Sequence, residues 1–414
     1  MIRYLLTVGD LESRPRTFDP ELSQVFTLAD GSMAVLHVHG RGLSAETYHE
    51  AVVGGRAVLQ VEGPSPSNFS EDLVGSDRVW ERLSDFSGFS SGLIVGDDVM
   101  VFRDHVGLLP VYVVLSELKA VTNIPVEAYA WSTKPQPLQP GTLMKMSLGQ
   151  ASPTSRLTSV EGGAENLLKS LSRAILELCP KHHAVFFSGG LDSLIIAKLS
   201  CDLSLNPRLL TLGVRGSVDF GRSMKAAETL GLDVVSLEVD EVMVKEALEQ
   251  LRPYLGSMTT MDSAIAAAMK ILSKAAVEEG CSAAVSGQGA DELFGGYKKY
   301  EKALVEHGYG LAGNMMRLDF SKLHEFGLPR DFIAVRSSGT YLITPYLSRR
   351  VVEVAYSTPL TDKISLENGR VVRKKVLREL CKNVGLGEFA DLEKKALQYS
   401  SGLEKMLKRS GYPS

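Results

Sequence analysis

Two polar, glycine-rich segments in the second half of the chain contain the residues best suited to chemistry. The first, SGGLDS, follows the short apolar run HAVFF at 183–187 and comprises Ser188, Gly189, Gly190, Leu191, Asp192 and Ser193. Its two glycines let the backbone approach an anion closely, and the start of the next helix offers unpaired N–H groups. The two serine hydroxyls add donors, so the segment has the composition of a phosphate cradle.

Asp192 distinguishes this segment from the ordinary P-loop. The segment lacks the lysine of GxxxxGK[ST], and a carboxylate here would repel a bare phosphate. An acid at this point makes sense if it holds Mg²⁺, which then bridges phosphate oxygens. In the alternative interpretation, Ser-Gly-Gly is a tight turn and Asp192 is an acid favoured by the helix dipole.

The second segment, VSGQGADELFGGYKKY at 285–300, surrounds the acid pair Asp291 and Glu292 with glycines. Asp291 could supply a second carboxylate to the same site if the two strand ends are neighbours. The alternative, a polar loop with helix-capping acids, is weaker because these small and acidic residues serve no packing purpose together.

The elements that must position these segments alternate between helices and strands from about residue 163 onward. Apolar residues recur at steps of three or four before 179, around 194, over 220–230 and over 265–272, and the short apolar or β-branched runs lie at 183–187, 208–214, 233–239 and 283–286. This alternation predicts an α/β fold with a doubly wound parallel sheet. Such sheets bind ligands at the carboxyl ends of their strands, where both segments fall.

The first part of the chain has a different pattern. Before about residue 150, short alternating apolar runs are separated by Asp-Gly, Gly-Gly and Asp-Asp, which predicts antiparallel strands and hairpins with one or two short helices. Residues 136–156 are rich in Pro, Gly and Ser and are the expected linker. We therefore expect two domains, 1–155 and 156–414.

Composition limits the classes of function. The 414 residues carry a net charge of −4 and are 44% hydrophobic, which is typical of a soluble globular protein and argues against electrostatic capture of nucleic acid or a membrane. No apolar run is long enough to span a bilayer, and the first residues turn acidic too early for a signal peptide, so we expect a cytoplasmic protein. The four cysteines all follow residue 178 and form neither a disulfide framework nor a CxxC metal site.

The two motifs resemble those of a known family. SGGLDS is similar to the loop of the ATP pyrophosphatase (PP-loop) superfamily, whose members cleave ATP to AMP and pyrophosphate, and 285–300 resembles the signature of the asparagine synthetase synthase domain. The resemblance implies an adenine nucleotide α-hydrolase-like fold, with ATP and Mg²⁺ as cofactors and Asp192 and Asp291 as metal ligands. It further implies that ATP is bound by Phe187, Ser188, Gly189, Gly190, Leu191, Asp192, Ser193, Leu212, Gly213, Ser286 and Gly287.

The resemblance also supplies catalytic candidates: Asp192, Asp291, Glu292, Gln288, Lys394 and Lys395. EKKALQYSSG at 393–402 resembles a family segment whose lysine stabilises the charged phosphates and the tetrahedral intermediate; Lys394 is the first choice and Lys395 the second. Without the family, such a lysine pair would be taken as a solvated face. RVVRKKVLREL at 370–380 resembles the family segment that precedes the last helices.

Two departures from the family pattern concern the base that would deprotonate the nucleophile and the segment 339–348. Gln288 stands where many members have a carboxylate proposed to deprotonate the amine, and an amide can orient but not accept a proton. Another group takes that role, the nucleophile differs, or the base is not essential. In GTYLITPYLS at 339–348, Tyr341, Ile343 and Ser348 replace the family's Glu, Arg and Asp.

Residues 86–113 resemble the glutaminase domain of class II amidotransferases, down to Arg103 and Asp104. This implies an α+β, β-rich, Ntn-hydrolase-like domain at the N-terminus. Its chemistry requires an N-terminal cysteine that attacks glutamine, whereas Met1 is followed here by Ile2 and Arg3. We interpret the domain as a degenerate glutaminase that serves structure.

The expected function is that of an AMP-forming ligase of asparagine synthetase type, which activates a carboxylate, most simply aspartate, and joins it to ammonia. The ammonia would be free or supplied by a separate glutaminase. Two alternatives remain open: an intramolecular cyclase of β-lactam synthetase or lasso-peptide cyclase type, and a non-catalytic ATP-binding regulatory protein. Because many amidotransferase-like chains dimerise, a homodimer is also an open expectation, although no feature of the sequence marks an interface.

Overall fold

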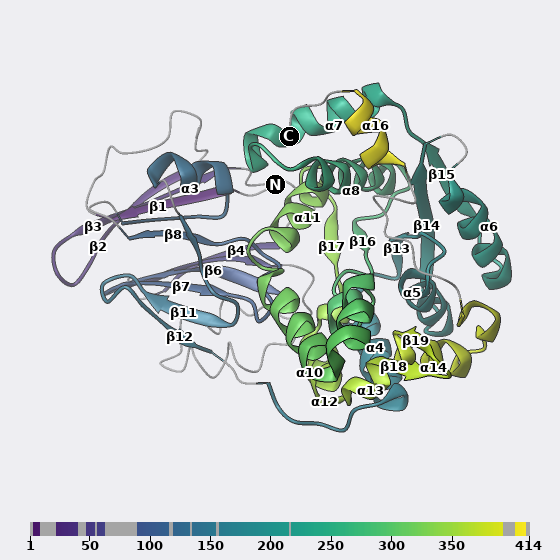
Figure 1. Cartoon of the computed structure of the whole chain (residues 1–414). Helices are drawn as coiled ribbons and strands as arrows, with labels where there is room; N and C mark the ends of the chain where they lie inside the picture. Colours follow the sequence, from purple (N-terminus) through teal and green to yellow (C-terminus); the bar gives the residue numbers. More distant parts are fainter. Residues whose placement is uncertain are drawn as a thin grey trace. The chain divides into compact units, whose positions relative to one another are not determined.

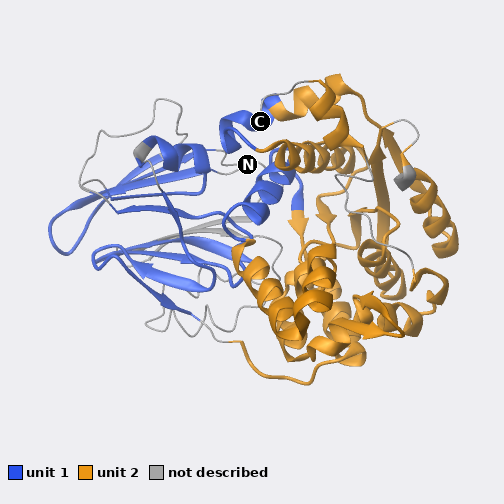
Figure 2. Cartoon of the chain, viewed as in Figure 1, with its two compact units in different colours: residues 1–156, 249–258, 324–341 blue, residues 157–248, 259–323, 342–414 orange. Residues whose placement is uncertain are grey.

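The computed structural model describes residues 3–8, 22–39, 47–53, 56–62, 89–115, 119–132, 135–154, 157–214, 217–391 and 402–410. The chain forms two compact units (Figure 2). Unit 1 comprises Met1–Arg156, Glu249–Met258 and His324–Tyr341, and unit 2 comprises Leu157–Leu248, Thr259–Leu323 and Leu342–Ser414. The sequence analysis placed all of 156–414 in one domain, which is wrong for 249–258 and 324–341, since both segments belong to unit 1.

Unit 1 is built on two six-stranded sheets (Figure 1). The first has the order β10 (Gln136–Pro137), β8 (Tyr112–Leu115), β9 (Lys119–Thr122), β1 (Arg3–Val8), β3 (Met33–His39) and β2 (Leu22–Thr27). The second has the order β12 (Gln150–Pro153), β11 (Thr142–Lys145), β7 (Val99–Arg103), β6 (Ser90–Val95), β5 (Arg56–Glu62) and β4 (Thr47–Val53). Neighbouring strands are antiparallel throughout both sheets, as predicted. The helix α3 (Pro125–Trp131) lies in the same part of the sequence as these strands, and the late segment 324–341 of unit 1 contains a further helix, α11 (Gly327–Arg336).

Arg103, at the end of β7, holds several segments of unit 1 together. Its buried guanidinium donates to four backbone carbonyls, those of Gly107 at 2.7 Å, Leu109 at 2.8 Å, Leu138 at 2.6 Å and His324 at 3.1 Å. Asp104 accepts from the N–H groups of Val106, Leu108 and Leu109. The Arg-Asp pair that resembles the glutaminase motif therefore satisfies buried backbone groups, and it joins the late segment 324–341 to unit 1.

Unit 2 contains a five-stranded sheet in the order β15 (Val234–Glu238), β14 (Asn206–Gly213), β13 (His182–Phe186), β16 (Ala283–Val285) and β17 (Tyr341–Ile343). β13 is parallel to β14 and to β16, and β14 is parallel to β15. The predicted parallel sheet is therefore confirmed. The connections contain α5 (Leu191–Asp202), α6 (Val218–Leu230), α7 (Glu241–Leu255) and α8 (Thr260–Glu278).

The strand order reverses direction at β13. The chain first moves outward to β14 and β15, and then returns to β16 on the other side of β13. Because parallel crossovers are right-handed, moving in both directions along a sheet places helices on both of its faces. The carboxyl ends of β13 and β16 therefore flank the topological switch point of the sheet, which is the usual position of the binding site in such sheets.

The remaining elements belong to unit 2, except α11, which lies in the unit 1 segment His324–Tyr341. They are α4 (Ala164–Leu178), α9 (Ala290–Phe294), α10 (Lys298–Lys322), α11 (Gly327–Arg336), η1 (Pro345–Leu347), α12 (Arg349–Ser357), α13 (Leu360–Lys363), β18 (Ile364–Glu367), β19 (Arg370–Arg373), α14 (Lys375–Asn383), η2 (Gly387–Phe389) and α16 (Leu403–Arg409). α4 buries Leu167, Leu171, Ile175 and Leu178, which matches the apolar spacing in its sequence.

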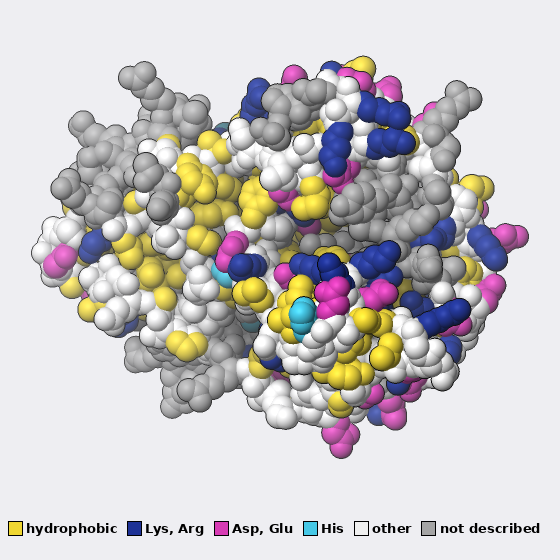
Figure 3. All heavy atoms as spheres, viewed as in Figure 1, with side chains coloured by type: hydrophobic (Ala, Val, Ile, Leu, Met, Phe, Trp, Pro, Cys, Tyr) yellow, Lys and Arg dark blue, Asp and Glu magenta, His cyan; other side chains and the backbone are white. Residues whose placement is uncertain are grey.

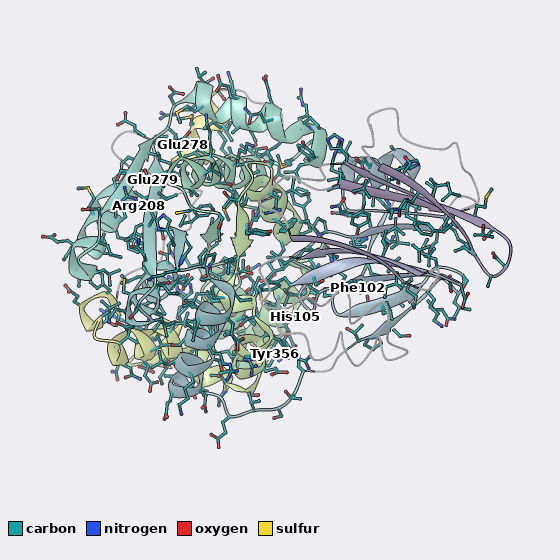
Figure 4. The ribbon with its side chains drawn as sticks, turned by 180° about the vertical axis from the view of Figure 1, so that it is seen from behind. Phe102, His105, Arg208, Glu278, Glu279 and Tyr356 are labelled. Atoms are coloured by element: carbon teal, nitrogen blue, oxygen red, sulfur yellow. The ribbon has the colours of Figure 1, made fainter. Side chains whose placement is uncertain are left out.

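Two observations concern the hydropathy of the described helices and the charges on the surface. None of the helices in the described ranges is long and apolar enough to cross a membrane. On the face of unit 2 visible in Figure 3, basic and acidic side chains are interspersed. At the amino-terminal end of the sheet, Arg208 of β14 donates to Glu279 at 2.7 Å; Figure 4 labels both residues.

Glu127 of α3 is a buried acid in unit 1, and it provides a test of this fold. It accepts a 2.8 Å hydrogen bond from Thr122 and lies 3.7 Å from the Arg3 guanidinium. Burial raises its pKa to about 7, an effect that Thr122 and Arg3 oppose. The folded protein therefore keeps a proton on Glu127 in a pH range where the unfolded chain has released it.

We predict that this proton makes the free energy of unfolding fall as pH rises from about 4.5 to 7, by on the order of 3 kcal/mol. Glu127→Gln is uncharged in both states and should remove that fall, so the variant should gain stability over the wild type with rising pH. Denaturant unfolding of both proteins between pH 4.5 and 8 measures the difference. Glu165→Gln, at an exposed pair with Lys169, is the control. A difference that does not vary with pH would contradict the prediction.

Candidate functional site

The two glycine-rich segments follow the carboxyl ends of the neighbouring strands β13 and β16. β13 and β16 are directly paired, with Val185 opposite Val285, so the loops that leave their carboxyl ends are neighbours. The backbone N–H of Ser286 donates to the carbonyl of Ile343 at 2.9 Å, which fixes the second loop against β17. The condition that the sequence analysis set for a shared site, adjacent strand ends, is met.

The first loop is a tight turn closed by its own serines. The Ser188 N–H donates to the Ser193 hydroxyl at 3.3 Å, and the Ser193 hydroxyl in turn donates to the Gly190 carbonyl at 3.2 Å. Gly189 has φ +64°, and a Cβ there would lie 2.8 Å from the backbone of Arg222. Only glycine fits this position, because both the backbone conformation and the neighbouring helix α6 exclude a side chain.

The second loop uses glycines to bring its backbone against acidic side chains. A Cβ on Gly287 would lie 2.9 Å from the Asp192 Cβ. A Cβ on Gly296 would lie 1.8 Å from Asp291 Oδ1 and 2.4 Å from the Lys374 Cε. The absence of side chains at these two positions therefore gives the acids of both loops room to converge.

Asp192 and Asp291 converge on the ammonium group of Lys374. Lys374 Nζ lies 2.6 Å from Asp192 Oδ1, 2.5 Å from Asp192 Oδ2 and 2.7 Å from Asp291 Oδ1. The exposed fractions of the side chains are 5% for Lys374, 21% for Asp192 and 19% for Asp291. Burial lowers the pKa of Lys374, and the charge of Asp192 opposes that effect.

Lys374 was missed by the sequence analysis, which placed it only within the segment 370–380. The signal was the Lys374–Lys375 pair that follows β19 in the sequence. Its two members have opposite environments, since Lys375 is exposed and pairs with Glu367 at 2.8 Å. Lys374 is the N-cap of α14 and has a left-handed backbone conformation, with φ 55° and ψ 39°. The direction of its side chain therefore depends on this local backbone conformation, which the spacing of residues in the sequence does not reveal.

Other side chains hold this arrangement in place. Arg373 donates to the Gly296 carbonyl at 2.8 Å and lies 3.3 Å from Glu301. The hydroxyl of the buried Tyr346, in the GTYLITPYLS segment, donates to the Asp192 carbonyl at 3.2 Å. Both loops and the strand end before Lys374 are thereby tied to one another by hydrogen bonds.

Glu292, the second acid of the pair in the sequence, has a different environment from Asp291. It is buried and accepts a 2.5 Å hydrogen bond from the Tyr297 hydroxyl. Burial raises its pKa, although Tyr297 and Lys374 oppose the rise. An acid placed in this way stabilises the loop, and its charge also interacts with that of Lys374.

The remaining candidates fall into three groups. Gln288 is half-buried in the second loop, next to Gly287. Phe187, Leu212 and Ser286 are buried, and Gly213 ends β14, so these four lie at or beside the carboxyl ends of the strands. Lys394 and Lys395 fall outside the described residues. Their segment ends at Gly402, where a Cβ would lie 2.6 Å from Val214 Cγ2, directly after β14.

The residues present fit a divalent cation of the Mg²⁺ type. Asp192 and Asp291 are carboxylates on separate loops that already bind one common positive charge. Mg²⁺ is typically held by one or two carboxylates together with substrate phosphates. Asp192 also lies in the first turn of α5, whose N-cap Gly190 provides no side-chain cap, so the backbone N–H groups beside it can bind an anion.

The contact of the Gly296 backbone with Asp291 and Lys374 can be tested by adding a side chain at Gly296. We predict that Gly296→Ala destabilises the protein by about 1–3 kcal/mol, because the added Cβ overlaps Asp291 and Lys374. Thermal and denaturant unfolding measure the loss. The matched control is Gly310→Ala in α10, where a Cβ meets nothing within 4 Å and where alanine favours the helix by up to about 1 kcal/mol. If both variants gained stability, the close approach at Gly296 would be disproved.

Comparisons with known proteins show which sequences this chain is similar to. Residues 180–326 match the family model described as asparagine synthase. Asparagine synthetase B (glutamine-hydrolyzing) of Escherichia coli is 26% identical over 360 residues, which cover 78% of this chain and 60% of that protein. An asparagine synthetase (glutamine-hydrolyzing) 1 of Methanocaldococcus jannaschii is 29% identical over 279 residues, which cover 60% of this chain and 51% of that protein.

The chain thus spans between about half and three fifths of the length of these relatives. Among solved structures, the NH3-dependent NAD synthetase of Campylobacter jejuni matches 38% of this chain and 76% of its own at 15% identity, with a TM-score of 0.25. A score this low supports no conclusion about the fold, which is established here by the strand pairing itself.

Proposed function

The chain contains an asparagine synthase domain and is related to the asparagine synthetases, and from this premise we propose that it is an ATP-dependent, AMP-forming ligase that converts a carboxylate into an amide. The observation that carries the proposal is the convergence of Asp192 and Asp291 beside the SGG turn, at the carboxyl ends of β13 and β16. This arrangement would combine phosphate binding and metal binding at one point of the sheet.

The proposed reaction has two steps. First, an oxygen of the substrate carboxylate attacks the α-phosphorus of ATP, the bond to the bridging oxygen breaks, and pyrophosphate leaves with that bond's electron pair. Second, a neutral amine nitrogen attacks the carbonyl carbon of the acyl-adenylate, loses a proton and expels AMP. Both steps transfer negative charge to phosphate oxygens, so groups that stabilise that charge accelerate the reaction.

The residues of the chain would divide this work among them. The backbone and hydroxyls of the SGG turn would bind the departing pyrophosphate, and Asp192 and Asp291 would hold Mg²⁺. The bound ion would supply positive charge to the phosphate oxygens. Lys394, or Lys395 after it, would stabilise charge at the reacting phosphate. Support for that role is the position of Gly402, the last residue of the EKKALQYSSG segment, which lies against Val214 directly after β14.

We further propose that aspartate is the carboxylate and that ammonia, rather than glutamine, is the nitrogen source. All four cysteines of the sequence lie at 179 or later, so residues 1–178 contain no thiol for glutamine attack. Near the start of the sequence, Arg3 of β1 instead has structural contacts within unit 1. Its guanidinium lies 3.7 Å from Glu127 and 6.0 Å from the ring centre of Tyr254. Free ammonia, or ammonia from a separate glutaminase, would then reach the acyl-adenylate.

A non-catalytic ATP-binding protein is the second candidate. Gln288 favours it, because this half-buried amide occupies the loop beside Asp192 and cannot accept a proton from an incoming amine. The arrangement of Asp192, Asp291 and the SGG turn opposes it, because buried charges are costly to maintain without a function. Turnover separates the two candidates.

We expect pyrophosphate release when the protein is given ATP, Mg²⁺, aspartate and ammonium, and no asparagine when glutamine replaces ammonium. A coupled assay for inorganic phosphate after pyrophosphatase treatment, with amino-acid analysis of the product, measures both outcomes. ATP binding without release for any amino acid would favour the non-catalytic alternative. Release with a carboxylate that carries its own amine, and cyclisation of that compound, would favour the cyclase.

Asp192→Asn should lower the rate of pyrophosphate release by on the order of 100-fold or more, because the amide removes a charged ligand from the phosphate site. Asp202→Asn, on the same helix α5, is the matched control, since Asp202 pairs at the exposed end with Lys198. Initial rates at saturating ATP compare the two. Equal rates for the two variants would refute the assigned role of Asp192.

A further inference from the structure

The ammonium group of Lys374 is fully engaged by the two acids that would hold the metal. Nζ donates hydrogen bonds to Asp192 Oδ2 at 2.5 Å and to Asp192 Oδ1 at 2.6 Å, and it forms an ion pair with Asp291 Oδ1 at 2.7 Å. Two of these oxygens belong to Asp192 and one to Asp291. The cation therefore occupies the point at which the two carboxylates converge.

Lys374 is held at that point by its surroundings. Its backbone is left-handed, a conformation that non-glycine residues adopt rarely, and its carbonyl accepts from the N–H of Arg378 at 2.9 Å. Its Cε lies against Gly296, where a Cβ would approach to 2.4 Å. The side chain is 5% exposed, so the ammonium cannot reach bulk water without rearrangement of this contact.

A divalent ion and this ammonium cannot both bind the carboxylates in the same way. Mg²⁺ binds its oxygen ligands at about 2.0–2.1 Å, closer than the ammonium does, and the ammonium already contacts three of the four carboxylate oxygens. Placing both cations together would also bring like charges into contact in a partly desolvated site. The metal must therefore displace the ammonium, and the displaced ammonium needs another anion.

We propose that Lys374 is an internal counter-cation that competes with the divalent metal for Asp192 and Asp291, so that the metal binds well only when a polyphosphate arrives with it and accepts the ammonium. This rests on the proposed function in taking the ligand to be a nucleoside triphosphate. The consequence is a coupling between metal and nucleotide: neither carboxylate releases Lys374 until phosphate oxygens from the SGG side can bind it.

The test is the binding of Mn²⁺ alone, without nucleotide, to the full chain. If Lys374 occupies the carboxylates most of the time, the apparent affinity of the wild type for Mn²⁺ is reduced by the fraction of time that they are free. Lys374→Met, which removes the charge and keeps the length, should therefore bind Mn²⁺ at least about tenfold more tightly than the wild type. Electron paramagnetic resonance of free Mn²⁺ gives both affinities.

Lys375→Met is the matched control, because the ammonium of Lys375 pairs with Glu367 at an exposed position. This variant should leave the Mn²⁺ affinity unchanged. The double variant Lys374→Met/Asp192→Asn should lose the gain, which places the bound ion at this site. Lys374→Gln, uncharged but polar, should change affinity in the same direction as Lys374→Met and serves if the methionine variant does not fold.

Three results would overturn the proposal. One is stoichiometric, tight binding of Mn²⁺ by the wild type without nucleotide, which needs no variant at all. Another is a folded Lys374→Met or Lys374→Gln that binds Mn²⁺ no better than the wild type. The third is a gain that survives Asp192→Asn. Because none of these measurements involves turnover, a protein that releases no pyrophosphate would defeat the proposed function and leave this inference standing.

Discussion

The structure of the second unit depends on one electrostatic arrangement, in which two carboxylates from separate loops share a single buried ammonium. Asp192 and Asp291 each leave the end of a different strand, and without a cation between them their charges would repel. Lys374 supplies that cation from a third element, at the start of α14. The arrangement joins three parts of the chain that are more than eighty residues apart in sequence. The conformation of the two loops therefore depends on contacts that form only when unit 2 is folded.

Glycine is what allows these charges to approach one another. Gly287 and Gly296 place backbone where any Cβ would overlap Asp192, Asp291 or Lys374, and Gly189 does the same against α6. The loops are therefore shaped by the absence of side chains as much as by hydrogen bonds. This explains why the motifs are rich in glycine but retain apolar residues such as Leu293 and Phe294, which are buried and anchor the short helix α9.

Unit 1 also contains a buried cationic side chain, Arg103, but its partners are backbone carbonyls. The guanidinium of Arg103 donates to four backbone carbonyls, so its role is to satisfy the backbone of a buried turn. One of those carbonyls belongs to His324, in a segment far along the chain. Residues that resemble a glutaminase motif thus maintain a fold, and the pair Arg3–Glu127 stands at the start of β1.

The sequence by itself determined the parallel sheet of unit 2, the antiparallel strands of unit 1, and the placement of Asp192 and Asp291 at strand ends, because apolar periodicity and glycine-rich breaks are local signals. Only the tertiary structure decided that strands β13 and β16 are neighbours, that segments 249–258 and 324–341 belong to unit 1, that Glu292 faces Tyr297, and that Lys374 rather than Lys375 meets the acids. Each of these depends on contacts between residues distant in sequence. Such contacts follow from how elements pack together, and no spacing within a single segment encodes them.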